Sequence, residues 1–347
     1  MPGFESLINQ ERPIRILTTL LRNGALPHAL LFTGTEGVGK QDAAVALAMA
    51  CNCRQENPEF HAENRSVADP ANSCDTSVSV KACGVCKSCR KIAAGNHPDI
   101  IRIKPKGPFI KIDQIRALLQ TLAMKPYEAM TRFAILSEAQ AMNAAASNAL
   151  LKILEEPPSR SMLVLIATRR SDLLPTIVSR CQHVGFNPIP KEKIAEWLEN
   201  EHGLAQPAAN ILAAVANGSF SRAQRLMNDN WLQHRKWLLD EIDQLSRQPI
   251  VGLLALAERL ARKRETLEES LEIIKVWYRD LIINRYDAGK IINCDIAAKI
   301  EKASQKNKLP DLLSSVDAIQ KTQNRLAAST NLRLAVESLL ISLAESS

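Results

Sequence analysis

The chain has 347 residues, 46% of them hydrophobic, and a formal net charge of +7. It is longer than the roughly 250–300 residues at which single hydrophobic cores stop growing, so we expect two or three domains. No apolar run reaches the roughly 18 residues that a membrane span needs, and the first residues lack a basic segment that leads into an apolar one. We therefore expect a cytoplasmic protein without a membrane partner, whose eight cysteines are reduced or bound to metal.

The first predicted elements are a short buried strand at residues 30–33, a glycine-rich loop, and an alanine-rich helix at about residues 41–50. The loop, residues 34–40, reads Gly-Thr-Glu-Gly-Val-Gly-Lys and has the spacing of a phosphate-binding P-loop. In such a loop the backbone amides surround the phosphates at a helix start, and the lysine neutralises their charge. The candidate nucleotide-binding residues are Gly34, Gly37, Gly39, Lys40 and Gln41.

Two positions that would organise Mg²⁺ in such a site are altered. Gln41 stands where a Ser or Thr hydroxyl would bind the metal. The apolar strand at residues 133–136 ends in Ser137 and Glu138, so an uncharged hydroxyl replaces the expected aspartate, although Glu138 stands where a water-positioning base would lie. Phosphoryl transfer depends strictly on the metal, and we therefore expect a degenerate site without turnover. Weak nucleotide binding through Lys40 remains open.

Further strands are predicted at residues 100–103, 133–136 and 163–167, with helical patterns at residues 113–124 and 144–154 between them. Strands that alternate with helices predict a parallel sheet with crossover helices on both faces. The expected fold class is α/β, with this P-loop domain covering residues 1–187.

Three cysteines, Cys83, Cys86 and Cys89, are spaced closely enough to bind one tetrahedral metal ion. A fourth ligand is needed, and the candidates upstream are Cys51, Cys53 and Cys74. Four thiolates leave no open coordination position, so the expected ion is a structural Zn²⁺. The zinc module would occupy about residues 51–90 as an insertion in the P-loop domain.

After the linker at residues 187–190, Asn-Pro-Ile-Pro, the pattern is almost entirely helical. Residues 188–245 suit a small helical lid, and residues 246–347 suit an all-α collar through which subunits would assemble. In the collar, apolar residues recur at helical spacing, for example at positions 267, 271, 274, 278 and 281.

The order of the motifs resembles that of the AAA+ clamp-loader subunits of bacterial DNA polymerase III, and the chain is identified as a member of that family over essentially its whole length. Besides the P-loop and the cysteines, the motifs that carry the resemblance lie at residues 97–99 (His-Pro-Asp), 112–116 (Ile-Asp-Gln-Ile-Arg), 148–158 (Asn-Ala-Leu-Leu-Lys-Ile-Leu-Glu-Glu-Pro-Pro), 174–177 (Leu-Pro-Thr-Ile) and 179–181 (Ser-Arg-Cys).

The resemblance implies an AAA+ (RecA-like) P-loop fold, and it selects Cys53 as the fourth zinc ligand, with Cys74 in reserve. It also implies that Arg180, between Ser179 and Cys181, is an arginine finger that reaches the ATP of a neighbouring subunit. The implied partners are gamma or tau and delta subunits in a hetero-pentamer, the sliding clamp, and primed DNA. We expect a non-hydrolysing member without enzymatic activity of its own. The alternative is an active ATPase of the gamma or tau type.

Overall fold

A computed structural model of the chain describes residues 3–55, 82–245, 248–327 and 331–345. The chain forms two compact units. Unit 1 comprises Met1–Pro190 together with Gly218–Ser221, and unit 2 comprises Lys191–Asn217 and Arg222–Ser347. The three-domain division predicted from the sequence, with boundaries near residues 187 and 245, stays a prediction.

Unit 1 contains a five-stranded parallel sheet in the order β2-β3-β4-β1-β5. Four of these strands were predicted, whereas the edge strand β5 was not. The strands are β1 (Ala29–Thr33), β2 (Ile100–Ile103), β3 (Arg132–Leu136), β4 (Ser161–Ala167) and β5 (Gln182–Gly185). The predicted fold class, a parallel α/β sheet of the P-loop type, is confirmed.

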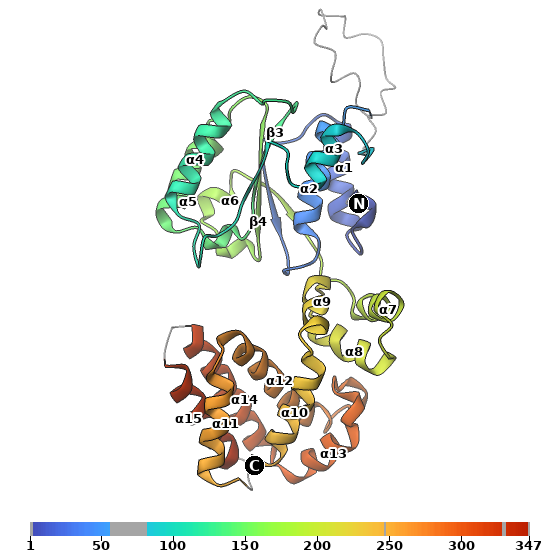
Figure 1. Ribbon diagram of the computed structural model, residues 1–347, viewed down its shortest axis with the longest axis vertical. Coiled ribbons are helices and arrows are strands. Elements are labelled where there is room, and N and C mark those ends of the chain that lie inside the picture. The colour runs from blue at the N-terminus through green and yellow to red at the C-terminus, as the bar shows by residue number, and fades with distance from the viewer. Residues whose placement is uncertain (1–2, 56–81, 246–247, 328–330, 346–347) are drawn as a thin grey trace, which may run out of the picture. The chain divides into compact units, whose positions relative to one another are not determined.

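Helices cover both faces of the sheet (Figure 1). One face is covered by α1 (Glu11–Arg22), α2 (Lys40–Asn52) and α3 (Lys87–Ala93), and the other by α4 (Ile112–Ala123), α5 (Ala144–Glu155) and α6 (Pro175–Val178). Short 3-10 helices lie at Phe4–Ser6, Ala139–Ala141 and Arg170–Asp172.

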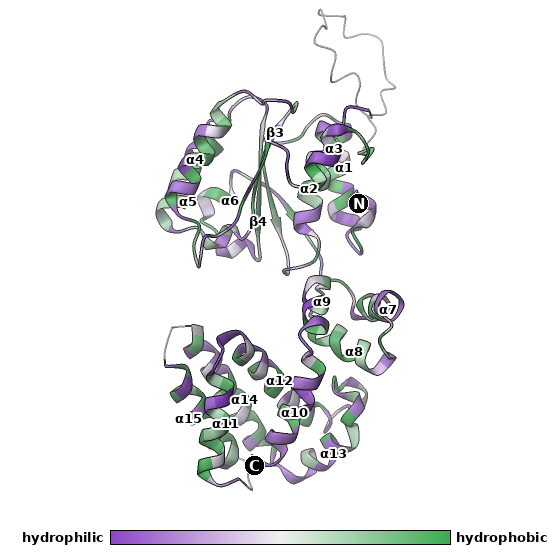
Figure 2. Ribbon diagram, viewed as in Figure 1, coloured by the Kyte–Doolittle hydropathy of each residue, from purple (hydrophilic) through white to green (hydrophobic). Residues whose placement is uncertain are grey.

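Alternate residues of each central strand enter opposite cores. In β1, Leu30 and Phe32 join the core under α1–α3, and Leu31 joins the core under α4–α6. Because both faces are buried, the middle residues of β1 and β3 are continuously apolar and do not alternate with polar residues; polar residues occur only at strand ends, as with Thr33 and Arg132. Figure 2 shows the same concentration of hydrophobic residues along the strands. The buried sheet holds the carboxyl ends of β1 and β3 in place. The candidate nucleotide-binding residues follow directly after these strand ends.

Unit 2 is helical in every long element that the structure describes. It contains α7 (Lys191–His202), α8 (Gln206–Val215), most of α9 (Phe220–Asn228), α10 (Trp231–Asp243), α11 (Ile250–Ala261), α12 (Arg264–Ile283), α13 (Ala297–Lys306), α14 (Leu309–Ala327) and α15 (Leu332–Glu345), with 3-10 turns at Ala288–Lys290 and Cys294–Ile296. Helix α12 packs against α10, α11, α13 and α14, and its predicted apolar positions are buried. No helix in the described part of the chain is long and apolar enough to cross a membrane.

Candidate functional site

The glycine-rich loop connects β1 to α2, as the sequence predicts. Strand β1 ends at Thr33 and α2 begins at Lys40, so the loop presents its backbone amides at the start of a helix. Gly37 (φ 76°) and Gly39 (φ 94°) both adopt the left-handed region, which a residue without a Cβ enters at no steric cost. The local geometry is that of a phosphate-binding loop.

Two of the loop glycines are also packed too tightly for any side chain. A Cβ on Gly34 would lie 2.6 Å from the carbonyl oxygen of Phe186, next to β5. A Cβ on Gly37 would lie 2.1 Å from Oγ of Ser219, in the segment Gly218–Ser221 that belongs to unit 1. The loop is therefore in direct contact with this segment.

The lysine of the loop is already bound to the loop itself. The side chain of Lys40 is buried, and its Nζ donates hydrogen bonds to the carbonyl oxygens of Gly34 (2.5 Å) and Thr35 (2.7 Å). Burial lowers the pKa of Lys40 to about 8, although the nearby Glu36 carboxylate acts in the opposite direction. Two of the three N–H donors of this ammonium group are thus taken by the loop, and one remains for a phosphate oxygen.

A cavity of about 490 Å³ lies beside the loop at the carboxyl ends of the strands. It brings together most of the predicted nucleotide residues, while Gly34 and Arg180 are not among its lining residues. The cavity is lined by Glu36, Gly37, Gly39, Lys40, Gln41, Asp42, Ser137, Glu138, Gln140, Ile166, Ala167, Thr168 and Ser221.

The electrostatics of this cavity do not favour a polyphosphate. Three carboxylates, Glu36, Asp42 and Glu138, line it together with the single cationic side chain of Lys40. Burial raises the pKa of Asp42, and the charge of Arg102 acts in the opposite direction. The uncharged hydroxyl of Ser137 stands where a metal-binding carboxylate was expected. The negative charge that would hold Mg²⁺ is therefore missing at this position, whereas the carboxylates elsewhere in the lining would repel a phosphate.

Glu138 follows β3 in a strained backbone conformation. Its φ of 54° lies in the left-handed region, which non-glycine residues seldom adopt, and Ala141 N donates to its carbonyl oxygen to close a 3-10 turn. Such strain is often found at functional positions because the surrounding fold must enforce it. The turn places Glu138 on the wall of the cavity, and its role in positioning a water molecule stays a prediction.

Arg180 follows the short helix α6 on the surface of unit 1. Its side chain is 37% exposed, its Nη2 lies 2.8 Å from Oε1 of Glu155, and its Nη1 donates to the carbonyl oxygen of Thr176 (3.1 Å). Ser179 is exposed, and its hydroxyl also donates to Thr176 O. The guanidinium is thus accessible from solvent yet oriented by two acceptors.

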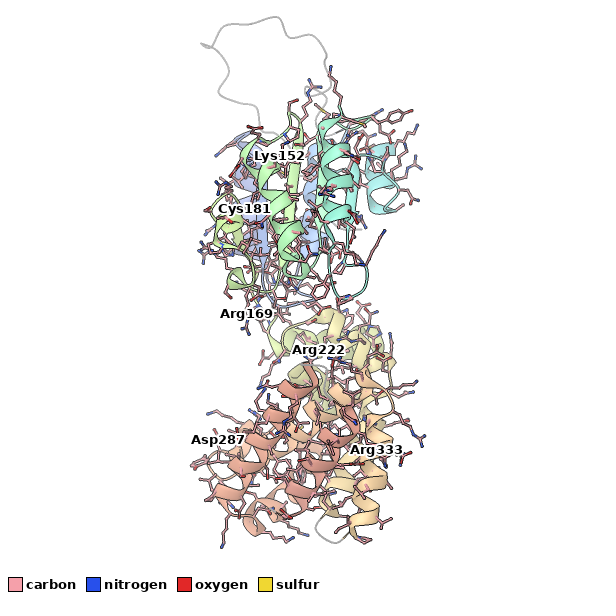
Figure 3. The ribbon with its side chains drawn as sticks, turned by 90° about the vertical axis from the view of Figure 1, so that its left-hand side faces the viewer. Lys152, Arg169, Cys181, Arg222, Asp287 and Arg333 are labelled. Carbon is pink, nitrogen blue, oxygen red and sulfur yellow. The ribbon has the colours of Figure 1, made fainter. Side chains whose placement is uncertain are left out.

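Cys181, the next residue, is buried in the core beneath α4–α6. Figure 3 labels it together with Lys152 of α5 and Arg169. Burial raises the pKa of the Cys181 thiol to about 12, so the thiol stays protonated near neutral pH and is a poor nucleophile. It packs as a small apolar residue.

Four cysteines come together at the end of α2. The Sγ atoms of Cys53, Cys83, Cys86 and Cys89 all lie within 4.8 Å of one another. Four thiolates around a tetrahedral Zn²⁺ at about 2.3 Å would have sulfurs about 3.8 Å apart, so a small contraction closes the cluster on an ion. The set contains the Cys53 that the resemblance selected. Cys51 is not in the cluster, and Cys74 lies outside the described residues.

Backbone amides also support thiolates at this cluster. Cys83 N donates to Sγ of Cys53 (3.4 Å), Cys86 N to Sγ of Cys83 (3.3 Å), and Cys89 N to Sγ of Cys86 (3.4 Å). Burial acts to raise the pKa of Cys86, but hydrogen bonds from the backbone amides of Cys89 and Arg54 and from the neighbouring thiols outweigh it and lower that pKa to about 7, whereas burial raises the pKa of Cys83 and of Cys89. The donor set fits a soft, closed, structural metal such as zinc.

Comparison with known proteins assigns the chain to a family. Residues 9–190 match the family model described as "DNA polymerase III, delta subunit", and residues 229–345 match its C-terminal model. The chain is 30% identical to the DNA polymerase III subunit delta' of Pseudomonas aeruginosa over 90% of each chain. The chain belongs to the DNA polymerase III delta' family.

Two further relatives lie in the same group of proteins. The delta' subunit of Bacillus subtilis is 28% identical over 97% of this chain and 96% of its own length. The tau subunit of Escherichia coli is 32% identical over 64% of this chain, and the match covers only 32% of tau. Similarity to delta' thus extends over almost the whole chain, whereas the similarity to tau extends over about two thirds of it.

One buried network of this family member was not anticipated from the sequence. Asp99 is fully buried and accepts hydrogen bonds from the backbone amides of Tyr127, Glu128 and Ala129 (2.8–2.9 Å). It also pairs with Arg132, whose Nη2 lies 2.7 Å from Oδ1. Burial acts to raise the pKa of Asp99, but these donors outweigh it and lower the pKa to about 2. The His-Pro-Asp motif at residues 97–99 therefore anchors the loop that leads into β3.

Proposed function

We propose that this chain is a non-hydrolysing subunit of the DNA polymerase III clamp loader and that it donates Arg180 to ATP bound by a neighbouring gamma or tau subunit. The position of Arg180 supports this proposal best. Its guanidinium is exposed, oriented by Glu155 and Thr176, and absent from the lining of the chain's own cavity. A permanently charged planar cation in this setting can stabilise the charge that develops on a transferred γ-phosphoryl group.

The chain's own cavity supports the other half of the proposal. Two of the three donors of Lys40 are taken by its own loop, Gln41 lacks the metal-binding hydroxyl, and Ser137 lacks the metal-organising carboxylate. Without a bound Mg²⁺ there is little else in a P-loop site to neutralise the charge of the transferred phosphoryl group. Nucleotide binding here is weak or absent.

The proposed partners follow from the family. The chain would assemble with gamma or tau and delta subunits in a hetero-pentamer that loads the sliding clamp onto primed DNA in the cytoplasm. A Zn²⁺ held by Cys53, Cys83, Cys86 and Cys89 would tie the end of α2 to α3, and its contribution would be structural because no ligand position is left for a substrate.

ATP hydrolysis by reconstituted complexes tests the proposal. Gamma or tau and delta subunits are mixed with clamp, primed DNA, and either the wild-type chain, Arg180→Ala, or Arg22→Ala as an exposed arginine control. We expect no hydrolysis by the isolated chain and strong stimulation by the wild type and by Arg22→Ala. With Arg180→Ala, single-turnover hydrolysis at the site that this chain completes should fall by about 10³-fold or more. Equal rates for Arg180→Ala and wild type would exclude the finger.

The second candidate function is an active ATPase of the gamma or tau type. The intact Gly-Lys loop, the strained Glu138 on the cavity wall, and the tau relative favour it. Hydrolysis by the isolated chain that disappears in Lys40→Ala would establish it and replace the non-hydrolysing role.

A further inference from the structure

We propose that Glu155 is the positioning residue of Arg180: its carboxylate holds the guanidinium in place before the neighbouring nucleotide arrives. This inference rests on the proposed role of Arg180 and adds a residue to which the resemblance assigns no part. It is carried by the 2.8 Å contact between Oε1 of Glu155 and Nη2 of Arg180 and by the way the chain places Glu155 there.

The proline pair after α5 determines where Glu155 lies. A residue that precedes proline is disfavoured in the α conformation, and Glu156, before Pro157, indeed leaves the helix with φ −123° and ψ 74°. Helix α5 therefore ends at Glu155, and α5 packs against α6, which precedes Arg180. The last helical residue is thus held next to the arginine by packing of the two helices.

The position of Glu155 is electrostatically unfavourable without Arg180. Carboxylates at a helix C-terminus interact unfavourably with the negative end of the helix dipole, and α5 ends with Glu155 followed by Glu156. The guanidinium supplies a compensating positive charge, in addition to that of Lys152 in the last turn of the helix. Glu156 is exposed and has no ion pair among the described residues, so only one of the two glutamates has this partner.

The contacts leave Arg180 able to bind an anion at the same time. Arginine has five N–H donors; here one on Nη1 donates to the carbonyl oxygen of Thr176, and Nη2 faces the Glu155 carboxylate in an ion pair. Three donors remain for phosphate oxygens, and the side chain is 37% exposed. Glu155 therefore need not be displaced. Its effect is to restrict the rotamers of a long side chain before binding, which lowers the ordering cost during the reaction.

The test compares Glu155→Gln with Glu156→Gln, an identical change one residue further along the chain. An exposed ion pair of this kind changes the ratio of oriented to free Arg180 side chains by about 2- to 5-fold. In the reconstituted complex, Glu155→Gln should lower the stimulated kcat by about 2- to 5-fold and leave the KM for ATP unchanged. Glu156→Gln should change neither the kcat nor the KM.

A second readout does not depend on the complex. In the isolated chain, the rate at which phenylglyoxal modifies Arg180 is followed by peptide mass spectrometry, and we expect a rise of about 2- to 5-fold in Glu155→Gln and none in Glu156→Gln. Equal modification rates would overturn the pairing. Faster modification with an unchanged or higher kcat would overturn the positioning role. A wild-type kcat in Arg180→Ala would instead refute the finger itself, whatever the modification rates show.

Discussion

Replacement of Asp99 by asparagine should destabilise unit 1 strongly at neutral pH. The asparagine side chain would keep the shape of the aspartate but remove the negative charge that faces the buried Arg132, whose side chain is only 7% exposed. Removal of one partner from a buried ion pair typically costs about 3–5 kcal/mol, because the remaining charge is left uncompensated. We expect a loss in the free energy of unfolding of that size at pH 7.

Part of the difference in the free energy of unfolding between wild type and Asp99→Asn depends on pH. The pKa of Asp99 is about 2 in the folded chain, compared with a usual value of 3.8. Because the folded pKa is the lower one, the stabilisation is fully present above pH 3.8 and is lost as the pH falls through 2. The two pKa values correspond to about 2 kcal/mol. The gap between wild type and Asp99→Asn should therefore narrow by about 2 kcal/mol between pH 5 and pH 2.

The assay must report on unit 1 alone. All four tryptophans, Trp197, Trp231, Trp237 and Trp277, lie in unit 2, so fluorescence would follow the wrong unit. Urea titrations at each pH are instead read by pulsed hydrogen exchange and mass spectrometry of peptides from β3. Asp113→Asn, at a side chain that is 84% exposed, serves as control and should cost less than about 0.5 kcal/mol. A difference in the free energy of unfolding between wild type and Asp99→Asn below about 1 kcal/mol at pH 7 would refute this account of Asp99, and so would a difference that does not change with pH.

Three further outcomes follow from the site. Elemental analysis of the purified chain should find one zinc per chain, lost in Cys83→Ser and retained in Cys294→Ser, and metal retention in both would contradict the cluster. Restoration of the metal ligands in the double variant Gln41→Thr/Ser137→Asp should create Mg²⁺-dependent ATP binding by calorimetry, and unchanged binding would show that other features close the cavity. Iodoacetamide at pH 8 should alkylate the exposed Cys294 far faster than Cys181, since burial raises the pKa of the Cys181 thiol to about 12, and comparable rates would refute that burial.

The sheet and its loop were predictable because strong local signals coincide there. Strands β1, β3 and β4 each contain a continuous apolar run, and the glycine pattern marks the turn into α2. Strand β5 was missed because its four residues, Gln182–Gly185, include only one that is fully buried, as expected at the edge of a sheet. Strand β5 depends on its pairing with β1 more than on its own sequence, whereas the other edge strand, β2, has three isoleucines in four residues and was predicted.

The cysteine set was only partly predictable. Spacing identifies Cys83, Cys86 and Cys89, but it cannot choose among upstream cysteines, because that choice depends on where α2 ends in space. Helix α2 ends at Asn52, and Cys53 follows in extended conformation beside the other three. The pairing of Arg180 with Glu155 was likewise hidden, since the two residues lie far apart in the chain and only the packing of α5 on α6 brings them together.

The state of Lys40 shows why a P-loop sequence alone is a weak argument for turnover. In this chain the loop has a structural role: Lys40 satisfies the carbonyl oxygens of Gly34 and Thr35, and Gly37 lies against Ser219 with no room for a side chain. These contacts would require the glycines and the lysine even if no nucleotide ever bound. The residues that serve the metal and have no such packing role, at positions 41 and 137, are the ones that differ from a working ATPase. A loop that the fold itself uses, without the expected metal ligands, is in keeping with our proposal of a subunit that assists ATP hydrolysis at a neighbouring subunit.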